Sequence, residues 1–243
     1  MDVNAQYNLA APYSIPIKVA GYQRRRMFDE FLAKTGIQQE DTVLDIGVTS
    51  DRTYSHSNYF ELWYPHKDRI TAVSTGDAAF LEELHPGLKF VLADGRNLPF
   101  ADQEFDYVHS SAVLEHVGSR EKQTALLSEA WRVARKGVFV TTPNRWFPVE
   151  FHTMMPFVHW LPTKAFRKLC DLRGMEFFAS EDNLNLLSGS QLKQIAARAG
   201  LGNFKVTSVG LAGWPSNLLL SARRAISVSS EGIASACMDS VAA

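Results

Sequence analysis

Cysteine is scarce in this sequence of 243 residues, and neither sign of charge dominates. Cys170 and Cys237 lie far apart in the chain, so they predict neither a disulfide framework nor a metal cluster, and we expect two reduced thiols and no metal site. The 25 Lys and Arg residues nearly balance the 26 Asp and Glu residues. A formal net charge of -1 argues against a strongly basic surface, so no nucleic-acid partner is expected.

Long apolar runs are also missing. No window approaches the roughly 20 apolar residues that a bilayer-spanning helix needs, so no integral membrane segment is expected. The first residues, MDVNAQYNLAAPYSIP, lack the basic and apolar regions of a signal peptide, which favours a cytoplasmic location. The 46% of hydrophobic residues is ordinary for a globular chain with a sizeable core. Nothing in the sequence indicates an oligomeric state.

Short apolar runs rich in β-branched residues recur along the first two thirds of the chain. They cover residues 41–47, 69–74, 88–94, 105–111 and 137–143. Such runs are typical of strands that are buried on both faces of a sheet. Helical patterns lie between them, so the sequence predicts an α/β fold, with a Rossmann-like, doubly wound and mostly parallel sheet and helices on both faces.

The helical patterns carry their own start and stop signals. Residues 23–36 form an apolar stripe that ends at Gly36. A second helix is expected to start at Asp77, and a third to start at Ser119 and stop at Gly137. A final helix and two strands, near 204–210 and 216–224, complete the regular structure.

The chain is expected to form one domain over residues 1–224. Residues 145–178 are rich in aromatics, prolines and histidines. We interpret them as an insertion that is mostly helical near its end and that caps a pocket. Residues 225–243 are small and polar, so they predict a disordered tail.

Polar residues follow the first three strands. They are Asp45 with Gly47, Ser74, and Asp94 with Gly95. In a doubly wound sheet, ligands bind outside the carboxyl ends of the strands, and a glycine there lets the backbone approach a ligand closely. A carboxylate such as Asp94 can accept a hydrogen bond from an adenine amino group. The alternative is that each of these residues only turns the chain.

Three segments together resemble the class I S-adenosylmethionine-dependent methyltransferases of the small-molecule branch. They are VLDIG at the first strand, LADGRNLPFADQEFDYVHSSAVLEHV over residues 92–117, and LLSEAWRVARKGVFVTTPN leading into the fifth strand. The resemblance implies a seven-stranded sheet with an antiparallel last strand and S-adenosyl-L-methionine as cofactor. It also implies a cofactor site at the strand ends, with Gly47 near the amino-acid moiety, Asp94 at the adenine and Ser110 or Ser111 beside the sulfur.

Two positions depart from that family pattern. Thr49 stands where a second glycine is expected, and Ser74 stands where an acidic residue usually binds the ribose hydroxyls. A serine cannot bind two hydroxyls as a carboxylate does, although Asp77 lies close enough in sequence to substitute. We retain Asp45, Thr49, Ser74 and Gly95 among the candidate cofactor residues.

Histidines and aromatics provide the candidates for the acceptor side. Methyl transfer mainly requires alignment of the reacting atoms, and an alcohol nucleophile also needs a base, so His116 and His152 are the candidate catalytic residues. For each of them the alternative is a structural role, which the sequence alone slightly favours. Four aromatic side chains of the insertion are expected to line the acceptor pocket or to form a small core of their own: Trp146, Phe147, Phe151 and Trp160.

The sequence therefore favours a methyltransferase that acts on a small molecule, such as a sugar, a lipid-linked glycan or a secondary metabolite. A nicotinamide-dependent oxidoreductase would need Gly-x-Gly-x-x-Gly and a ribose-binding acid, and both are missing. A degenerate methyltransferase-like module with a binding role is the remaining alternative, and the changes at Thr49 and Ser74 are its best support.

Overall fold

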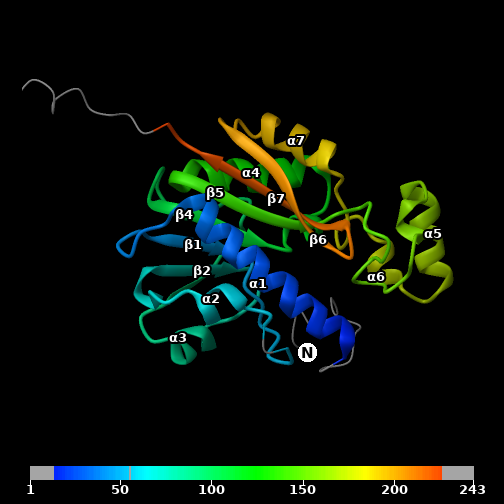
Figure 1. The fold of residues 1–243 in the computed structure, drawn as a ribbon, viewed down its shortest axis with the longest axis horizontal. Helices are drawn as coiled ribbons and strands as arrows, with labels where there is room; N and C mark the ends of the chain where they lie inside the picture. Colours follow the sequence, from blue (N-terminus) through cyan, green and yellow to red (C-terminus); the bar gives the residue numbers. More distant parts are fainter. Residues whose placement is uncertain (1–13, 55, 226–243) are drawn as a thin grey trace, which may run out of the picture.

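A computed structural model describes residues 14–54 and 56–225, and these residues form one seven-stranded sheet (Figure 1). The strands are β1 (Val43–Ile46), β2 (Ile70–Ser74), β3 (Lys89–Leu92), β4 (Phe105–Ser111), β5 (Ala134–Pro143), β6 (Phe204–Leu211) and β7 (Trp214–Arg223). Their spatial order is β3-β2-β1-β4-β5-β7-β6. The first five strands pair in parallel, and β7 pairs antiparallel with both β5 and β6. The predicted doubly wound sheet with an antiparallel last strand is therefore confirmed.

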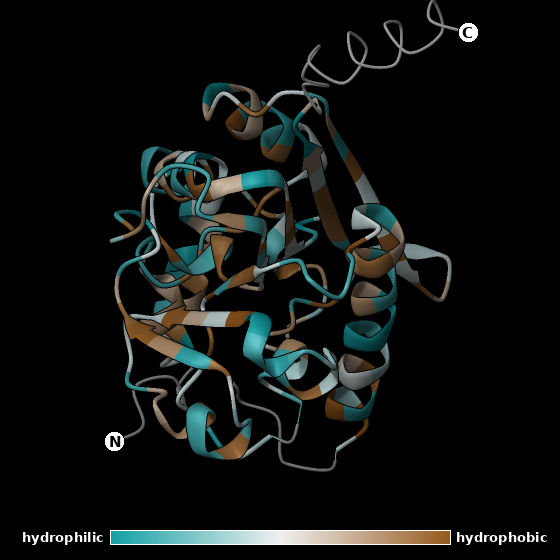
Figure 2. Ribbon diagram, turned by 90° about the vertical axis from the view of Figure 1, so that its left-hand side faces the viewer, coloured by the Kyte–Doolittle hydropathy of each residue, from teal (hydrophilic) through white to brown (hydrophobic). Residues whose placement is uncertain are grey.

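Helices cover both faces of this sheet, as predicted. The α-helices are α1 (Ile15–Thr35), α2 (Tyr59–Trp63), α3 (Phe80–Leu84), α4 (Arg120–Val133), α5 (Thr163–Leu172), α6 (Glu176–Ala179) and α7 (Gly189–Arg198). The 3-10 turns are η2 (Lys67–Arg69), η3 (Leu114–His116) and η4 (Val158–Trp160). One large apolar cluster joins α4 and α7 to one face of the sheet, and a second joins α1, α2 and α3 to the other. In Figure 2, the long helix α1 shows both brown and teal segments, as expected for a helix that buries only one side.

The helix boundaries agree with the sequence only in part. Helix α1 ends at Thr35, and Gly36 follows in the left-handed conformation and donates its N–H to the carbonyl of Leu32, as a glycine stop should. The helix begins earlier than predicted, with Pro16 in its first turn, where a proline is well tolerated. Ser119 is confirmed as the cap of α4, because its side chain accepts from the N–H of Lys122.

Two expected helix signals have other roles. Helix α3 begins at Phe80 rather than at Asp77, and the Asp77 carboxylate accepts the N–H of Ala79 in the turn before the helix. The stop at Gly137 is wrong, since α4 ends at Val133 and Gly137 lies inside β5. A Cβ atom at Gly137 would lie 2.5 Å from the carbonyl oxygen of Ala222 on β7. The glycine is needed for the close approach of two strands and not for a helix end.

Segment 145–178 projects from the sheet, with α5 and α6 at the right of Figure 1. Its predicted helices near the end are confirmed. The segment and the residues after it have an apolar cluster of their own, made of Met155, Phe166, Cys170, Phe178, Leu184 and Leu186. The predicted disordered tail lies outside the described residues, except for Ala225.

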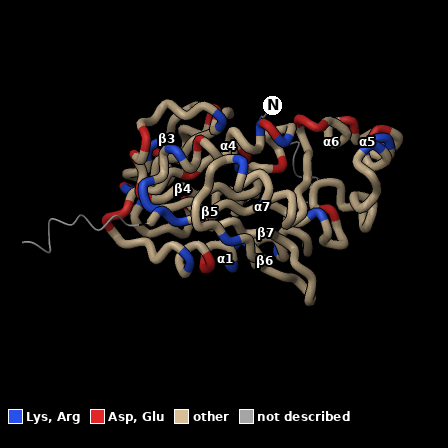
Figure 3. The backbone as a smooth tube through the Cα atoms, turned by 90° about the horizontal axis from the view of Figure 1, so that it is seen from above, with Lys and Arg blue, Asp and Glu red and all other residues tan. Residues whose placement is uncertain are grey.

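Charged residues of both signs are interspersed along the chain (Figure 3). Among the residues that the structure describes, no helix is long and apolar enough to cross a membrane.

The contact between β5 and β7 gives a direct test of the sheet. Gly137→Ala is expected to lower the free energy of unfolding by about 1–3 kcal/mol, because the added methyl group cannot fit against backbone. Gly202→Ala is a matched control, since no described atom lies within 4 Å of the Cβ position there. Urea unfolding of both variants measures the difference, and equal stability would contradict the strand contact.

Candidate functional site

A cavity of about 470 Å³ opens at the carboxyl ends of β1, β2, β3 and β4. Six of the eight predicted cofactor residues line it, and so do both predicted catalytic histidines. These residues are Gly47, Thr49, Ser74, Asp94, Gly95, Ser111, His116 and His152. The structure thus brings together strand ends and an insertion residue that are distant in sequence, at the edge where doubly wound sheets bind ligands.

Two predicted cofactor residues lie beneath the cavity and not in its wall. Ser110 is fully buried, and its hydroxyl donates to the carbonyl of Ile46 on the neighbouring strand. Asp45 is buried beside His109. Neither side chain lines the cavity, and both make their hydrogen bonds to neighbouring protein groups beneath it.

Gly47 is held in place by the protein's own packing. Its φ of 99° lies in the left-handed region, and its N–H donates to the carbonyl of Val73 at 2.7 Å. A Cβ atom there would lie 2.1 Å from Cγ2 of Val113. Any other residue at this position would displace the η3 turn that follows Val113, so the glycine shapes the cavity as well as opening it.

Thr49 replaces the expected second glycine because the loop is held by a different contact. The side-chain amide of Asn58 bonds both backbone groups of Thr49: Oδ1 accepts its N–H at 2.8 Å, and Nδ2 donates to its carbonyl at 3.0 Å. The Thr49 hydroxyl accepts the N–H of Asp51 at 3.0 Å. The loop therefore follows a path fixed by side chains and needs no glycine at this position.

The second departure, at Ser74, is not compensated by Asp77. The Ser74 hydroxyl accepts the N–H of Gly76 and faces the cavity, whose wall also includes Thr75. Asp77 is exposed and does not line the cavity. Hydroxyl groups, and not a carboxylate, are therefore the polar groups that this strand end offers to a ligand.

Asp94 offers a carboxylate that is already paired. Arg96 binds it in a bidentate fashion, with three nitrogen–oxygen distances of 2.6–3.0 Å. The hydrogen bond from Arg96 lowers the pKa of Asp94, so the carboxylate is ionised at neutral pH. A fixed anion at the cavity wall is a suitable acceptor for an amino group of a ligand.

A buried polar cluster forms the floor on the side of α2. The His109 ring contacts the carboxyl group of Asp45 at 2.5 Å through Nδ1 and the hydroxyl of Tyr59 at 3.2 Å through Nε2. Burial raises the pKa of Asp45 to about 7 and lowers that of His109 to about 4, so the uncharged pair is favoured. Burial also raises the pKa of Glu61, which is fully enclosed next to Asp45.

This cluster predicts a pH dependence of stability. A carboxyl group whose pKa is raised on folding stabilises the fold fully below its ordinary value of 3.8, and this contribution is lost as the pH rises through about 7. The melting temperature should therefore fall between about pH 4 and about pH 8. Asp45→Asn should reduce this fall, and the exposed Asp171→Asn should not change it. A scan in which both variants keep the wild-type slope would contradict the assignment.

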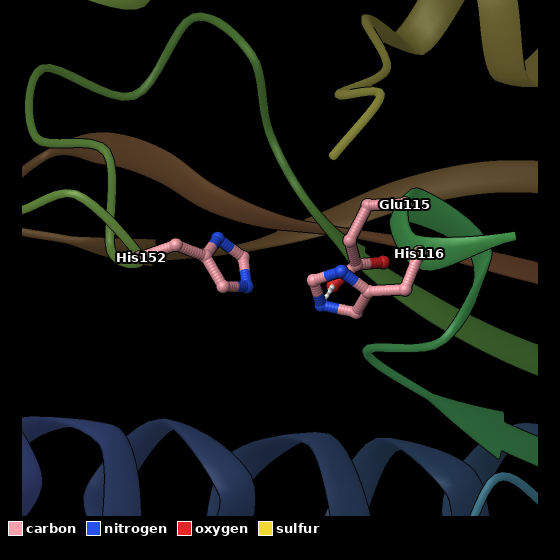
Figure 4. Close-up of side chains that lie close together, drawn as sticks. All are labelled: Glu115, His116 and His152. Carbon is pink, nitrogen blue, oxygen red and sulfur yellow. Dashed lines mark ion pairs between the residues drawn. The ribbon is translucent and has the colours of Figure 1, made fainter. Parts of the chain in front are cut away.

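The two histidines line the cavity beside each other, although they come from different elements. His116 ends η3 and His152 belongs to the insertion, and their rings meet edge to face with centroids 4.7 Å apart (Figure 4). His152 Nδ1 contacts the Glu150 carboxylate at 2.6 Å, and His116 Nδ1 donates to the carbonyl of Asn183 at 2.7 Å.

The electrostatic surroundings of the two rings differ. Burial, followed by the neighbouring His152, lowers the pKa of His116 to about 3. Burial alone would lower the pKa of His152, but the adjacent Glu150 carboxylate raises it above its ordinary value. The same contact keeps Glu150 ionised, with a pKa lowered to about 2 even though burial opposes ionisation.

The aromatic side chains of the insertion do not line this cavity. Trp146 is half exposed and lies against Trp160, which stacks on Trp214 of β7. Phe147 stacks on Phe151 at 5.1 Å. The expectation that these four rings form the wall of the pocket is not supported for this cavity, because they pack on one another instead. His152 alone among the insertion residues reaches the cavity wall.

Arg24 and Tyr59 also line the cavity, and neither is among the site residues predicted from the sequence. Arg24 stands one helical turn before Phe28 and two turns before Phe31, which are both buried. Helical periodicity thus places Arg24 on the inner face of α1, and this signal was available in the sequence. Nothing in the sequence distinguished Tyr59.

Residues 55–141 match the methyltransferase domain family. No curated protein sequence matches the chain. Solved structures of low sequence identity share the fold. A Thermotoga maritima S-adenosylmethionine-dependent methyltransferase, described as a possible histamine N-methyltransferase, is 18% identical with a TM-score of 0.53, over 86% of this chain and 98% of that one.

Two further neighbours show how widely this fold is used. The Burkholderia thailandensis 1,6-didemethyltoxoflavin-N1-methyltransferase, solved with its substrate and S-adenosylhomocysteine, is 15% identical with a TM-score of 0.55, over 89% of this chain and 93% of that one. The [4+2]-cyclase SpnF is 14% identical with a TM-score of 0.50, over 82% and 80% of the two chains.

Residues 55–141 thus match a methyltransferase domain, and the chain shares its fold with S-adenosylmethionine-dependent methyltransferases. The two methyltransferases among these neighbours use S-adenosylmethionine as cofactor, and the cavity of this chain fits that cofactor in three respects. Its volume lies in the range of small-molecule sites. It offers charged groups of both signs, Arg24 and Asp94. The hydroxyl of Ser57 in its wall is buried and has no hydrogen-bond partner among the described residues, as expected of a group that awaits a ligand.

Proposed function

We propose that the protein methylates a small molecule that enters the cavity between the strand ends and the insertion. The observation that carries this proposal is the position of His116 and His152, which line the same cavity as Gly47, Asp94 and Ser111. S-adenosylmethionine would supply a methyl group on a positively charged sulfur, and such a reaction asks the protein mainly for alignment.

Each part of the cavity has a role in this proposal. Asp94 and Gly95 hold the adenosine part of the cofactor, and Arg24 supplies a positive charge for its carboxylate. Ser74 and Thr75 offer hydroxyl groups to the ribose, in place of the usual acid. The wall between the cofactor-binding groups and the acceptor is formed by Gly47, Thr49 and Ser111.

The two histidines act on the acceptor. A backbone carbonyl fixes the Nδ1 proton of His116, and the Glu150 carboxylate fixes that of His152, so both rings have set orientations. His152, whose pKa the Glu150 carboxylate raises, is the stronger base of the two, and its Nε2 can accept a proton from the acceptor. Small molecules are the favoured acceptors, since two structural neighbours are described as a possible histamine methyltransferase and a didemethyltoxoflavin methyltransferase.

A binding module without methyl transfer is the second candidate. Ser74 in place of the ribose acid favours it, and the cyclase among the structural neighbours shows that proteins of this fold carry out other chemistry. The two candidates differ in one measurable property. Transfer of a labelled methyl group to the small-molecule fraction of a cell extract is expected from the enzyme and not from the module.

Ligand selectivity tests the cofactor directly. Calorimetry on the full chain should show binding of S-adenosylhomocysteine and S-adenosylmethionine, and much weaker binding of NAD, because no dinucleotide fingerprint follows β1. Binding of NAD without binding of either adenosyl-sulfur ligand would contradict the proposal.

Asp94→Ala tests the adenosine contact. The variant should bind S-adenosylhomocysteine with an affinity lower by about 1.5–3 kcal/mol, the usual contribution of a hydrogen bond to a charged group. Asp171→Ala, at an exposed position on α5, should bind like the wild type. A folded Asp94→Ala protein with unchanged affinity would show that Asp94 serves only to bind Arg96.

A further inference from the structure

Three side chains of the kinds that ligate metals meet in and beneath the wall of the cavity. Glu115 and His116 come from η3, and His152 comes from the insertion; Figure 4 shows the three groups close together. One potential ligand atom from each lies within 4.8 Å of the others. Oε1 of Glu115 is 3.8 Å from Nε2 of His116.

Each of these side chains is oriented by a hydrogen bond to a neighbouring group of the protein. His152 contacts Glu150 through Nδ1, and His116 donates from Nδ1 to the carbonyl of Asn183. The hydroxyl of Thr142 on β5 donates to Oε2 of Glu115 at 2.9 Å. Imidazoles bonded through one nitrogen to a carboxylate or a carbonyl are the usual outer arrangement around a bound metal ion, because they present the other nitrogen in a fixed direction.

The surroundings of the Glu115 carboxyl group independently indicate a bound cation. Its side chain is completely buried, and Oε1 has no hydrogen-bond partner among the described residues. A buried carboxylate oxygen without a partner is costly, and proteins usually compensate such a group with a cation or a hydrogen-bond donor. Here the oxygen lies next to two imidazoles, which together with it form a donor set of two nitrogens and one oxygen.

We propose that Glu115, His116 and His152 bind a divalent transition-metal ion. Ligands about 2.1 Å from a tetrahedral metal ion are separated by about 3.4 Å, so the 3.8 Å pair fits almost as it stands. The ligand atoms of the three residues are separated by up to 4.8 Å, so the largest of these distances has to shorten when a metal ion binds. A small movement of His152 toward Glu115 and His116 would shorten it, since His152 comes from the insertion and not from the sheet. Two imidazoles and one carboxylate suit Zn²⁺, Fe²⁺ or Mn²⁺ better than Mg²⁺ or Ca²⁺.

The metal ion would activate the acceptor. Three protein ligands leave at least one coordination position open, and His116 and His152 line the cavity, so that position faces the bound small molecule. An acceptor hydroxyl coordinated there would form a metal–oxygen bond and release its proton to water, since a metal ion lowers the pKa of a bound hydroxyl. This role rests on the proposed function, whereas the binding of the ion does not.

Metal binding is tested on the full chain without a histidine tag, treated with a chelator and dialysed. Titration with Co²⁺, followed by visible absorption and calorimetry, should show one ion per chain, and Zn²⁺ should compete for it. Glu115→Gln and His152→Ala should each weaken Co²⁺ binding by about 100-fold or more, since loss of an outer hydrogen bond alone costs about 10–100-fold. His66→Ala, which removes a histidine outside the cavity, is the matched control and should bind like the wild type.

Glu150 serves as a positioning residue in this site. Glu150→Gln should weaken Co²⁺ binding by about 10–100-fold. If Glu115→Gln fails to fold, the loss of Co²⁺ binding in His152→Ala tests the site, because the His152 ring lies at the cavity wall and not in the core. Absence of a stoichiometric ion, or equal binding by wild type and His152→Ala, would overturn the metal site.

Parallel titration with S-adenosylhomocysteine separates this proposal from the proposed function. Cofactor binding without metal binding overturns the metal site alone. Metal binding without cofactor binding keeps the metal site and overturns the proposed function.

Discussion

The register of β4 between β1 and β5 determines where the polar groups of the site lie. Ser110 pairs with Ile46 on one side and with Val140 on the other, so the next residues of all three strands reach the same edge of the sheet. The Ser111 hydroxyl bonds the Thr141 hydroxyl at 2.8 Å, and Ala112 donates its N–H to the carbonyl of Thr141. A shift of one residue would turn each of these side chains to the opposite face.

The same register positions the η3 turn and, through it, the proposed acceptor side of the cavity. Val113 packs against Gly47 of the neighbouring strand end, and Thr142 of β5 bonds Glu115. The insertion begins directly after β5, where Asn144 donates its N–H to the carbonyl of Ser216 on β7. His152 therefore arrives opposite η3 because both segments start from adjacent strand ends. The proposed cofactor wall and the proposed acceptor wall are two consequences of one strand arrangement.

Much of this fold is predictable from the sequence, since short apolar runs mark buried strands and the order of runs and helices defines the topology. Gly137 shows where prediction from the sequence fails. A glycine after a helical pattern can end a helix, but it can also permit the close approach of two strands. Only the contact with β7, far away in the sequence, distinguishes these two roles. The residues at the strand ends were predictable for the same topological reason. Arg24 was predictable from helical periodicity, although it was not selected.

The acceptor side was less accessible to sequence reasoning. Trp146 and its aromatic neighbours are as suitable for a pocket wall as for a small cluster, and composition does not indicate which way a ring faces. The grouping of Glu115 with His116 and His152 was not predicted, because His152 lies on a separate segment with no recognisable ligand spacing to the other two residues. The path of the Thr49 loop likewise depends on Asn58, which carries no sequence signal of its own.

A crystal structure of the full chain grown with S-adenosylhomocysteine and Mn²⁺ would test the central claim that one cavity serves both cofactor and acceptor. We expect the adenosine beside Asp94 and Gly95, the ligand sulfur near Ser111, and an anomalous peak between Glu115, His116 and His152. An adenosine bound away from the ends of β1, β2, β3 and β4 would contradict the account.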